Sequence, residues 1–146
     1  MYDLKMVLLK SNLDILKTKE KDAKMAKILL VDDSETLRTQ VKKVLEKNGY
    51  EVVEGGNGLE GLEQIKAHSD IALILCDVNM PEMDGLTMIE KLAADTSAKK
   101  TPIFMLTTES SMDMKTRGKA AGVMAWVTKP FVEEKILAAI KKVLSM

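Results

Sequence analysis

The chain has 146 residues, of which 46% are hydrophobic, so it is long enough for one compact domain that buries a core without disulfides. Its 22 basic and 22 acidic residues cancel, and this balance excludes a net field that would draw the protein to nucleic acid or to an anionic membrane. Cys76 is the single cysteine, which excludes an intrachain disulfide and indicates a reducing compartment.

No segment has the pattern of a membrane span or a secretory signal. The longest uninterrupted apolar run, Ile71 to Cys76, is far shorter than the roughly 20 residues that cross a bilayer. The N-terminus lacks the sequence of basic start, apolar stretch and small-residue cleavage site that marks a signal peptide. We therefore expect a cytoplasmic protein with no membrane insertion.

Residues 1–24 differ in pattern from everything that follows them. Their apolar residues are spread over more than one helical stripe, which is a poor basis for packing on a single core. We expect these residues to form an N-terminal extension, helical or disordered, and residues 25–146 to form one domain.

From Lys27 onward, short aliphatic runs alternate with longer stretches of helical period, which is typical of βαβ units around a parallel sheet. Strands are predicted at residues 27–31, 50–54, 71–76, 102–106 and 124–127. The third strand is apolar throughout and should therefore lie at the centre of a sheet covered on both faces. The sequence predicts an α/β fold, a doubly wound five-stranded parallel sheet with five helices, of which the one at residues 111–121 has the weakest apolar stripe.

Polar side chains follow four of the five predicted strands. Asp32 and Asp33 come directly after the first strand, Asp77 after the third, Thr107 after the fourth and Lys129 after the fifth. Ligands of open α/β sheets bind beyond the carboxyl ends of the strands, so we expect these five side chains to lie together at one edge of the sheet.

Three carboxylates that converge on one site would raise one another's pKa values unless a positive charge were present. Carboxylate oxygens without His or Cys partners favour a hard cation, and an open site that also admits phosphate oxygens suits Mg²⁺. The ammonium of Lys129 and the hydroxyl of Thr107 would then be left for other oxygens of a phosphoryl group. Each residue alone could be a helix cap, a turn hydroxyl or a solvated amine; the joint placement indicates a phosphoryl-transfer site.

Four motifs resemble those of receiver domains in two-component response regulators, a family of signalling phosphoproteins. They are LLVDDS at 29–34, CDVNMPEMDG at 76–85, MLTT at 105–108 and WVTKPF at 126–131. Within that family the chain most resembles single-domain chemotaxis regulators of the CheY type. The resemblance implies a flavodoxin-like, CheY-like sheet with strand order 2-1-3-4-5, which would set Asp33 beside Asp77.

The resemblance also implies a role for each acidic residue of the site. Asp77 would be the phosphoacceptor, taking a phosphoryl group from a phosphohistidine. The carboxylates of Asp33 and Asp77 and the backbone carbonyl of Asn79 would hold Mg²⁺, and Asp32 would act on the ion through water. Lys129 would pair with a phosphoryl oxygen.

Further residues are implied to report phosphorylation or to limit its lifetime. Thr107 and Trp126 would form the switch, with the hydroxyl moving toward the phosphoryl group and the aromatic ring moving inward. Asn79 and Glu109 would tune dephosphorylation. By this interpretation the protein is not an enzyme, because it takes part only in its own phosphorylation and dephosphorylation.

The expected partners are proteins, because the chain ends directly after the last predicted helix and leaves no room for an output domain. A CheA-like histidine kinase would be the phosphodonor, the target would be a flagellar motor switch component or a related protein, and a phosphatase is a further candidate. One alternative is a phosphorelay shuttle that returns the phosphoryl group to a histidine phosphotransfer domain. A second is a nucleotide-binding α/β enzyme, since residues 56–61 match G-x-G-x-x-G after a strand.

Overall fold

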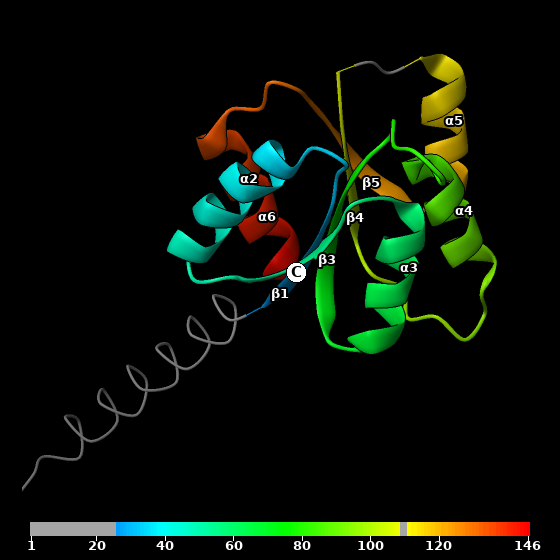
Figure 1. Ribbon diagram of the computed structural model, residues 1–146, viewed down its shortest axis with the longest axis horizontal. Coiled ribbons are helices and arrows are strands. Elements are labelled where there is room, and N and C mark those ends of the chain that lie inside the picture. Colours follow the sequence, from blue (N-terminus) through cyan, green and yellow to red (C-terminus); the bar gives the residue numbers. More distant parts are fainter. Residues whose placement is uncertain (1–25, 109–110) are drawn as a thin grey trace, which may run out of the picture.

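The computed structural model describes residues 26–108 and 111–146, which form one parallel sheet with helices on both faces (Figure 1). The strands are β1 (Lys27–Val31), β2 (Glu51–Gly55), β3 (Ile71–Asp77), β4 (Ile103–Thr107) and β5 (Val123–Thr128). The helices are α2 (Glu35–Lys47), α3 (Gly58–Ala67), α4 (Gly85–Ala94), α5 (Met112–Ala120) and α6 (Glu133–Leu144). Strand order is β2-β1-β3-β4-β5, which confirms the predicted doubly wound, flavodoxin-like fold; the predicted extension at residues 1–24 lies outside the described residues.

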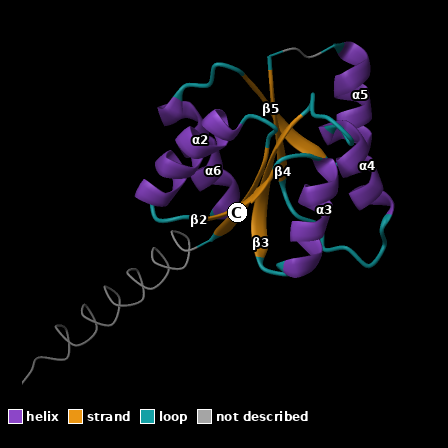
Figure 2. Cartoon of the chain, in the orientation of Figure 1, coloured by secondary structure: helices purple, strands orange, loops and turns teal. Residues whose placement is uncertain are grey.

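The two faces of the sheet are covered by different helices, with α2 and α6 on one side and α3, α4 and α5 on the other (Figures 1 and 2). The alternation of side chains along β1 divides its residues between the two layers. Ile28 and Leu30 pack with residues of α2 and α6, whereas Leu29 and Val31 pack with residues of α4. All four are at most 1% exposed, so the strand that leads into the acidic residues is held from both sides.

Every predicted strand is present, with boundaries that differ by at most one residue from the expected ones. The weakly patterned segment near residue 115 is also a helix, α5, which Ser111 caps through the backbone N–H of Met114. Ser34 caps α2, so the alternative that Asp32 or Asp33 is that cap is wrong. Asp84 does cap α4, accepting from the N–H of Thr87 at 2.8 Å.

No helix in the described part of the chain is long and apolar enough to cross a membrane. Cys76 is fully buried in β3, where burial raises the pKa of its thiol, as expected of a small core residue rather than a reactive one.

Candidate functional site

The carboxyl ends of β1, β3, β4 and β5 deliver the predicted polar residues to one edge of the sheet. Asp32 and Asp33 follow β1, Asp77 and Thr107 are the last residues of β3 and β4, and Lys129 follows β5. Because parallel strands end at the same edge, residues far apart in the chain become neighbours there.

Lys129 joins two of the acidic residues. Its Nζ lies 2.7 Å from Oδ2 of Asp32 and 3.4 Å from Oδ2 of Asp77. Its backbone N–H donates to the carbonyl of Thr107 at 2.8 Å, which holds the segment after β5 against the end of β4. The side chain is only 15% exposed, so the ion pairs are largely shielded from solvent.

Burial distinguishes this site from the rest of the described surface. Asp32, Asp77 and Thr107 are 1%, 7% and 3% exposed and are the buried polar side chains of the described residues. Burial raises the pKa of the Asp77 carboxyl, and the negative charge of Asp32 raises it further. The Lys129 ammonium and the N–H of Val78, which donates to Oδ1 of Asp77 at 2.8 Å, partly oppose that rise in pKa.

Asp32, Asp33 and Asp77 each offer a carboxylate oxygen, and these oxygens lie within 4.8 Å of one another. Asp33 is exposed, so the cluster opens to solvent on the side of that residue. Three carboxylates around one opening, with the pKa of one already raised by another, are suited to a hard divalent cation. The residues therefore fit Mg²⁺ by the chemistry of their donor atoms.

The loop after β3 brings its backbone unusually close to Asp77. The Gly85 N–H donates to the carbonyl of Val78 at 2.8 Å, and a Cβ added at Gly85 would lie 1.9 Å from the carbonyl oxygen of Asp77. Only glycine can occupy this position without displacing the loop. Gly85 ends the motif CDVNMPEMDG, but the motif alone did not predict this close approach to Asp77. The available signal was a glycine directly after Asp84, the residue that caps α4.

The glycine run at residues 56–61 has a packing explanation. The Gly58 N–H donates to the carbonyl of Met83 at 2.9 Å, and a Cβ at Gly58 would lie 2.7 Å from the Met83 side chain. Asn57 caps α3 through the N–H of Glu60. The run thus joins the start of α3 to the loop after β3, which accounts for Gly58 without a bound nucleotide.

Three further residues predicted from the sequence are Asn79, Trp126 and Glu109. Asn79 is exposed in the loop two residues beyond Asp77. Trp126 is half-buried in the middle of β5, and its ring lies against Gly118 of α5, where an added Cβ would be 2.6 Å from the indole. Glu109 lies outside the described residues. One neighbour that sequence reasoning missed is Arg38, which donates to the backbone carbonyl of Asp32.

The chain is similar to known proteins over most of its length. The family model described as "Response regulator receiver domain" matches residues 28–141. The chain is 39% identical over 119 residues to chemotaxis protein CheY1 of Helicobacter pylori, covering 81% of this chain and 96% of that relative. It is 34% identical over 116 residues to sensor histidine kinase CheAY of Helicobacter pylori, covering 79% of this chain and 14% of that kinase. Among solved structures, chemotaxis response regulator CheY4 of Vibrio cholerae aligns with a TM-score of 0.74 at 40% identity, covering 82% of this chain and 98% of that one.

Proposed function

Because the chain belongs to the family of response regulator receiver domains, of the CheY chemotaxis type, we propose that Asp77 accepts a phosphoryl group from a phosphohistidine and that the phosphorylated protein binds a target in chemotaxis. The observation that carries the proposal is the position of Lys129, whose ammonium lies between the carboxylates of Asp32 and Asp77. A cation and three carboxylates at one edge of the sheet provide both the nucleophile and the charge that phosphoryl transfer requires.

In the transfer step, a carboxylate oxygen of Asp77 attacks phosphorus and forms an acyl phosphate. The P–N bond of the phosphohistidine breaks, and its electron pair remains on the imidazole nitrogen. Asp77 must be ionised to attack, and the Lys129 ammonium favours that form against the burial that disfavours it. In the product, Lys129 would pair with a phosphoryl oxygen.

Asp33, Asp77 and the backbone carbonyl of Asn79 would hold Mg²⁺, with Asp32 acting on the ion through water. When bound, Mg²⁺ supplies positive charge that offsets the charge on the phosphoryl oxygens. The exposed position of Asp33 and the donor oxygens within 4.8 Å support this assignment.

Phosphorylation would be read out through Thr107 and Trp126. Thr107 would turn its hydroxyl toward the phosphoryl group, and the ring of Trp126 would then move inward. Trp126 is half-buried in β5, and its ring lies against Gly118 of α5. This contact supports the proposal that movement of the ring would displace that helix. A local charge change would in this way alter a binding face built on α5, β5 and α6.

The phosphodonor would be a CheA-like histidine kinase, and the similarity to part of the kinase CheAY supports a partner of that class. A flagellar motor switch component is the proposed target, and a phosphatase is a further proposed partner. We also propose that residues 25–146 form the receiver domain and that residues 1–24 form an N-terminal extension to it.

The first test is the intact mass of the protein after incubation with Mg²⁺ and acetyl phosphate. Wild type should gain one labile phosphoryl group, with a parallel change in Trp126 fluorescence, whereas Asp77→Asn should gain none. Asp84→Asn is the matched control, because Asn also caps helices well and the variant should be phosphorylated like wild type. Equal phosphorylation of wild type and Asp77→Asn would exclude Asp77 as the acceptor.

A second test addresses the fate of the phosphoryl group. We propose that Asn79 and Glu109 control access of water to the acyl phosphate, so Asn79→Ala and Glu109→Ala should change its rate of loss. Unchanged rates in both variants would rule out that role. Rapid transfer from Asp77 to an added histidine phosphotransfer domain would instead favour the phosphorelay shuttle.

A further inference from the structure

Asp32 is held by contacts to every one of its polar groups. Its N–H donates to the carbonyl of Gly55 at 3.0 Å, and its own carbonyl accepts from Nη1 of Arg38 at 2.6 Å. Its Oδ1 accepts from the N–H of Ser34 at 2.9 Å, and its Oδ2 accepts from Lys129 at 2.7 Å. Contacts from β2, through Gly55, and from α2, through Arg38, therefore both orient the main chain that carries Asp32 and Asp33.

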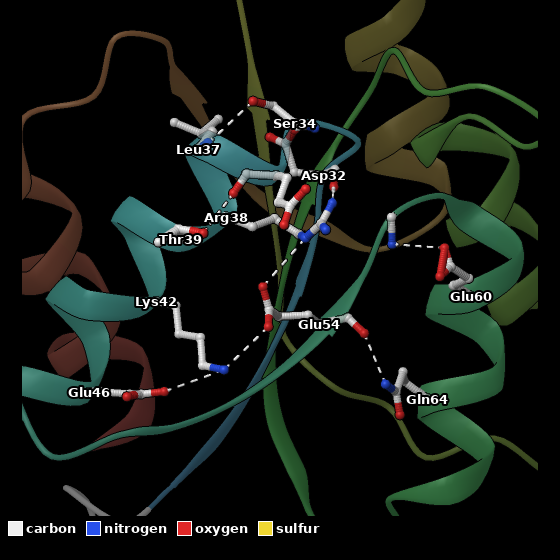
Figure 3. A network of polar contacts seen from close by, with 12 residues as sticks. Asp32, Ser34, Leu37, Arg38, Thr39, Lys42, Glu46, Glu54, Glu60 and Gln64 are labelled. Atoms are coloured by element: carbon white, nitrogen blue, oxygen red, sulfur yellow. Dashed lines mark hydrogen bonds and ion pairs between the residues drawn. The ribbon is translucent and has the colours of Figure 1, made fainter.

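Arg38 is the side-chain donor to this main chain (Figure 3). It lies in the first turns of α2, and its backbone N–H donates to the carbonyl of the helix cap, Ser34, at 2.9 Å. The side chain is only 19% exposed, although an arginine at the start of a helix gains nothing from the helix dipole there. A mostly buried cation at this position needs specific partners, and the carbonyl of Asp32 is one of them.

Glu54 of β2 holds the guanidinium from its other side. Its Oε1 lies 3.4 Å from Nε of Arg38, a nitrogen that is buried without a hydrogen bond of good geometry. The Glu54 backbone carbonyl accepts from Gln64 of α3 at 2.9 Å, and its Oε2 lies 3.3 Å from Nζ of Lys42 (Figure 3). Arg38 thus connects Glu54 of the neighbouring edge strand β2 to the end of β1.

We propose that Arg38 is a positioning residue for the cation site: by fixing the carbonyl of Asp32, it sets the orientation in which Asp32 and Asp33 present their carboxylates. This inference rests on the proposed binding of Mg²⁺ and assigns to it a residue that touches neither the ion nor the phosphoryl group. Residues that orient metal ligands from behind typically contribute 10- to 100-fold to metal affinity.

The direction in which Mg²⁺ affinity changes when Arg38 is replaced distinguishes a positioning role from a purely electrostatic one. Arg38 carries a positive charge against the main chain of Asp32, one of the residues of the acidic cluster, so its charge alone repels a divalent cation. Removing that charge would strengthen Mg²⁺ binding if electrostatics were its only contribution. If Arg38 positions Asp32 and Asp33, its removal weakens Mg²⁺ binding instead.

The experiment is a calorimetric titration of the full chain with MgCl₂, without phosphodonor, for wild type, Arg38→Met, Arg38→Lys and Lys42→Gln. Arg38→Met removes the charge and the donor, and Arg38→Lys keeps the charge but loses the planar fork that faces Asp32 and Glu54 together. Lys42→Gln is the matched control, because Lys42 lies one turn later on α2 and pairs with Glu54 and Glu46 rather than Asp32. Urea unfolding of each variant ensures that only folded protein is compared.

The Kd for Mg²⁺ should rise roughly tenfold in Arg38→Met and by a smaller factor in Arg38→Lys, while Lys42→Gln should change it less than about twofold. An unchanged or lower Kd in Arg38→Met, with wild type binding Mg²⁺ normally, would overturn the positioning role and leave the proposed function intact. Absence of Mg²⁺ binding by wild type would overturn the metal site itself and this inference with it.

Discussion

The centre of the sheet and its β5 edge differ in how completely their residues are buried. In β3, six of seven residues are buried, whereas none of the six residues of β5 is. Helix α4 buries four residues, and α5 buries only Gly118. Asp77, the proposed phosphoacceptor, therefore lies on the firmly packed part of the molecule, and the proposed moving ring of Trp126 lies on the lightly packed part. Preorganised chemistry needs a rigid support, while a switch needs an element that can be repacked at low cost.

Gly85 and Gly118 show the same difference between the firmly packed and the lightly packed region. At Gly85 an added Cβ would meet the backbone oxygen of Asp77, which cannot move without displacing the site. At Gly118 it would meet the indole of Trp126, a side chain at a half-exposed position that can shift. Gly→Ala at each position tests whether the two regions differ as the packing indicates.

Gly85→Ala should have the largest effect. A Cβ at 1.9 Å from the Asp77 carbonyl oxygen forces the loop after β3 to move, so the free energy of unfolding should fall by roughly 3 kcal/mol or more. Phosphorylation by acetyl phosphate should be lost in the fraction that still folds. Urea unfolding followed by far-ultraviolet circular dichroism measures the first effect and intact mass the second. A variant as stable and as readily phosphorylated as wild type would refute the close approach.

Gly118→Ala should change stability by less than about 1 kcal/mol, because alanine's better helix propensity offsets the displacement of the ring. Its effect should instead be seen in Trp126, whose emission maximum should shift as the indole moves. Lys119→Ala, on the exposed side of α5, is the control and should leave emission unchanged. A loss of stability as large as that of Gly85→Ala would abolish the distinction between the two regions.

Asp77→Asn should raise the free energy of unfolding in the absence of Mg²⁺, the smallest of the three effects. The folded-state pKa of Asp77 is raised above the ordinary value of 3.8, so between those two pKa values the folded state binds more protons than the unfolded state. The wild-type contribution of this group to stability therefore falls as pH rises through that interval. Asparagine carries no such charge and should escape the loss.

The measurement is urea unfolding of wild type and Asp77→Asn at a series of pH values in EDTA. The stability advantage of the variant should be present at neutral pH and should shrink as pH falls toward 3.8, where Asp77 of wild type is protonated. Added Mg²⁺ should also reduce the advantage, because it stabilises the ionised cluster. An advantage independent of pH would mean that the charge of Asp77 is not its source.

Much of the fold was predictable because the signals for it are local. Alternation and helical period depend on neighbouring residues, so strand boundaries were predicted to within one residue. The convergence of Asp32, Asp77, Thr107 and Lys129 followed from a general rule, that ligand sites lie beyond the carboxyl ends of parallel strands. Caps were harder, because Ser34, Asp32 and Asp33 are all suitable residue types within three positions of one another.

The contacts of Arg38 could not have been predicted from its place in α2. Its side chain is placed by Glu54, a residue of strand β2, and by a backbone carbonyl that no side-chain motif describes. The same holds for Gly85 and Gly118, since the atoms that an added Cβ would meet come from β3 and β5. Such contacts depend on the distances between elements, which the sequence pattern of either element does not contain.

Asp32 and Asp33 mark the division between what sequence and tertiary structure determine. The sequence by itself determined that two carboxylates follow β1 at the edge of the sheet where Asp77 ends β3. Only the tertiary structure decided that Asp32 is 1% exposed and paired with Lys129, while its neighbour of identical chemistry is open to solvent. The physical reason is that successive side chains leave the backbone in different directions, and packing around the site decides which of those directions is buried.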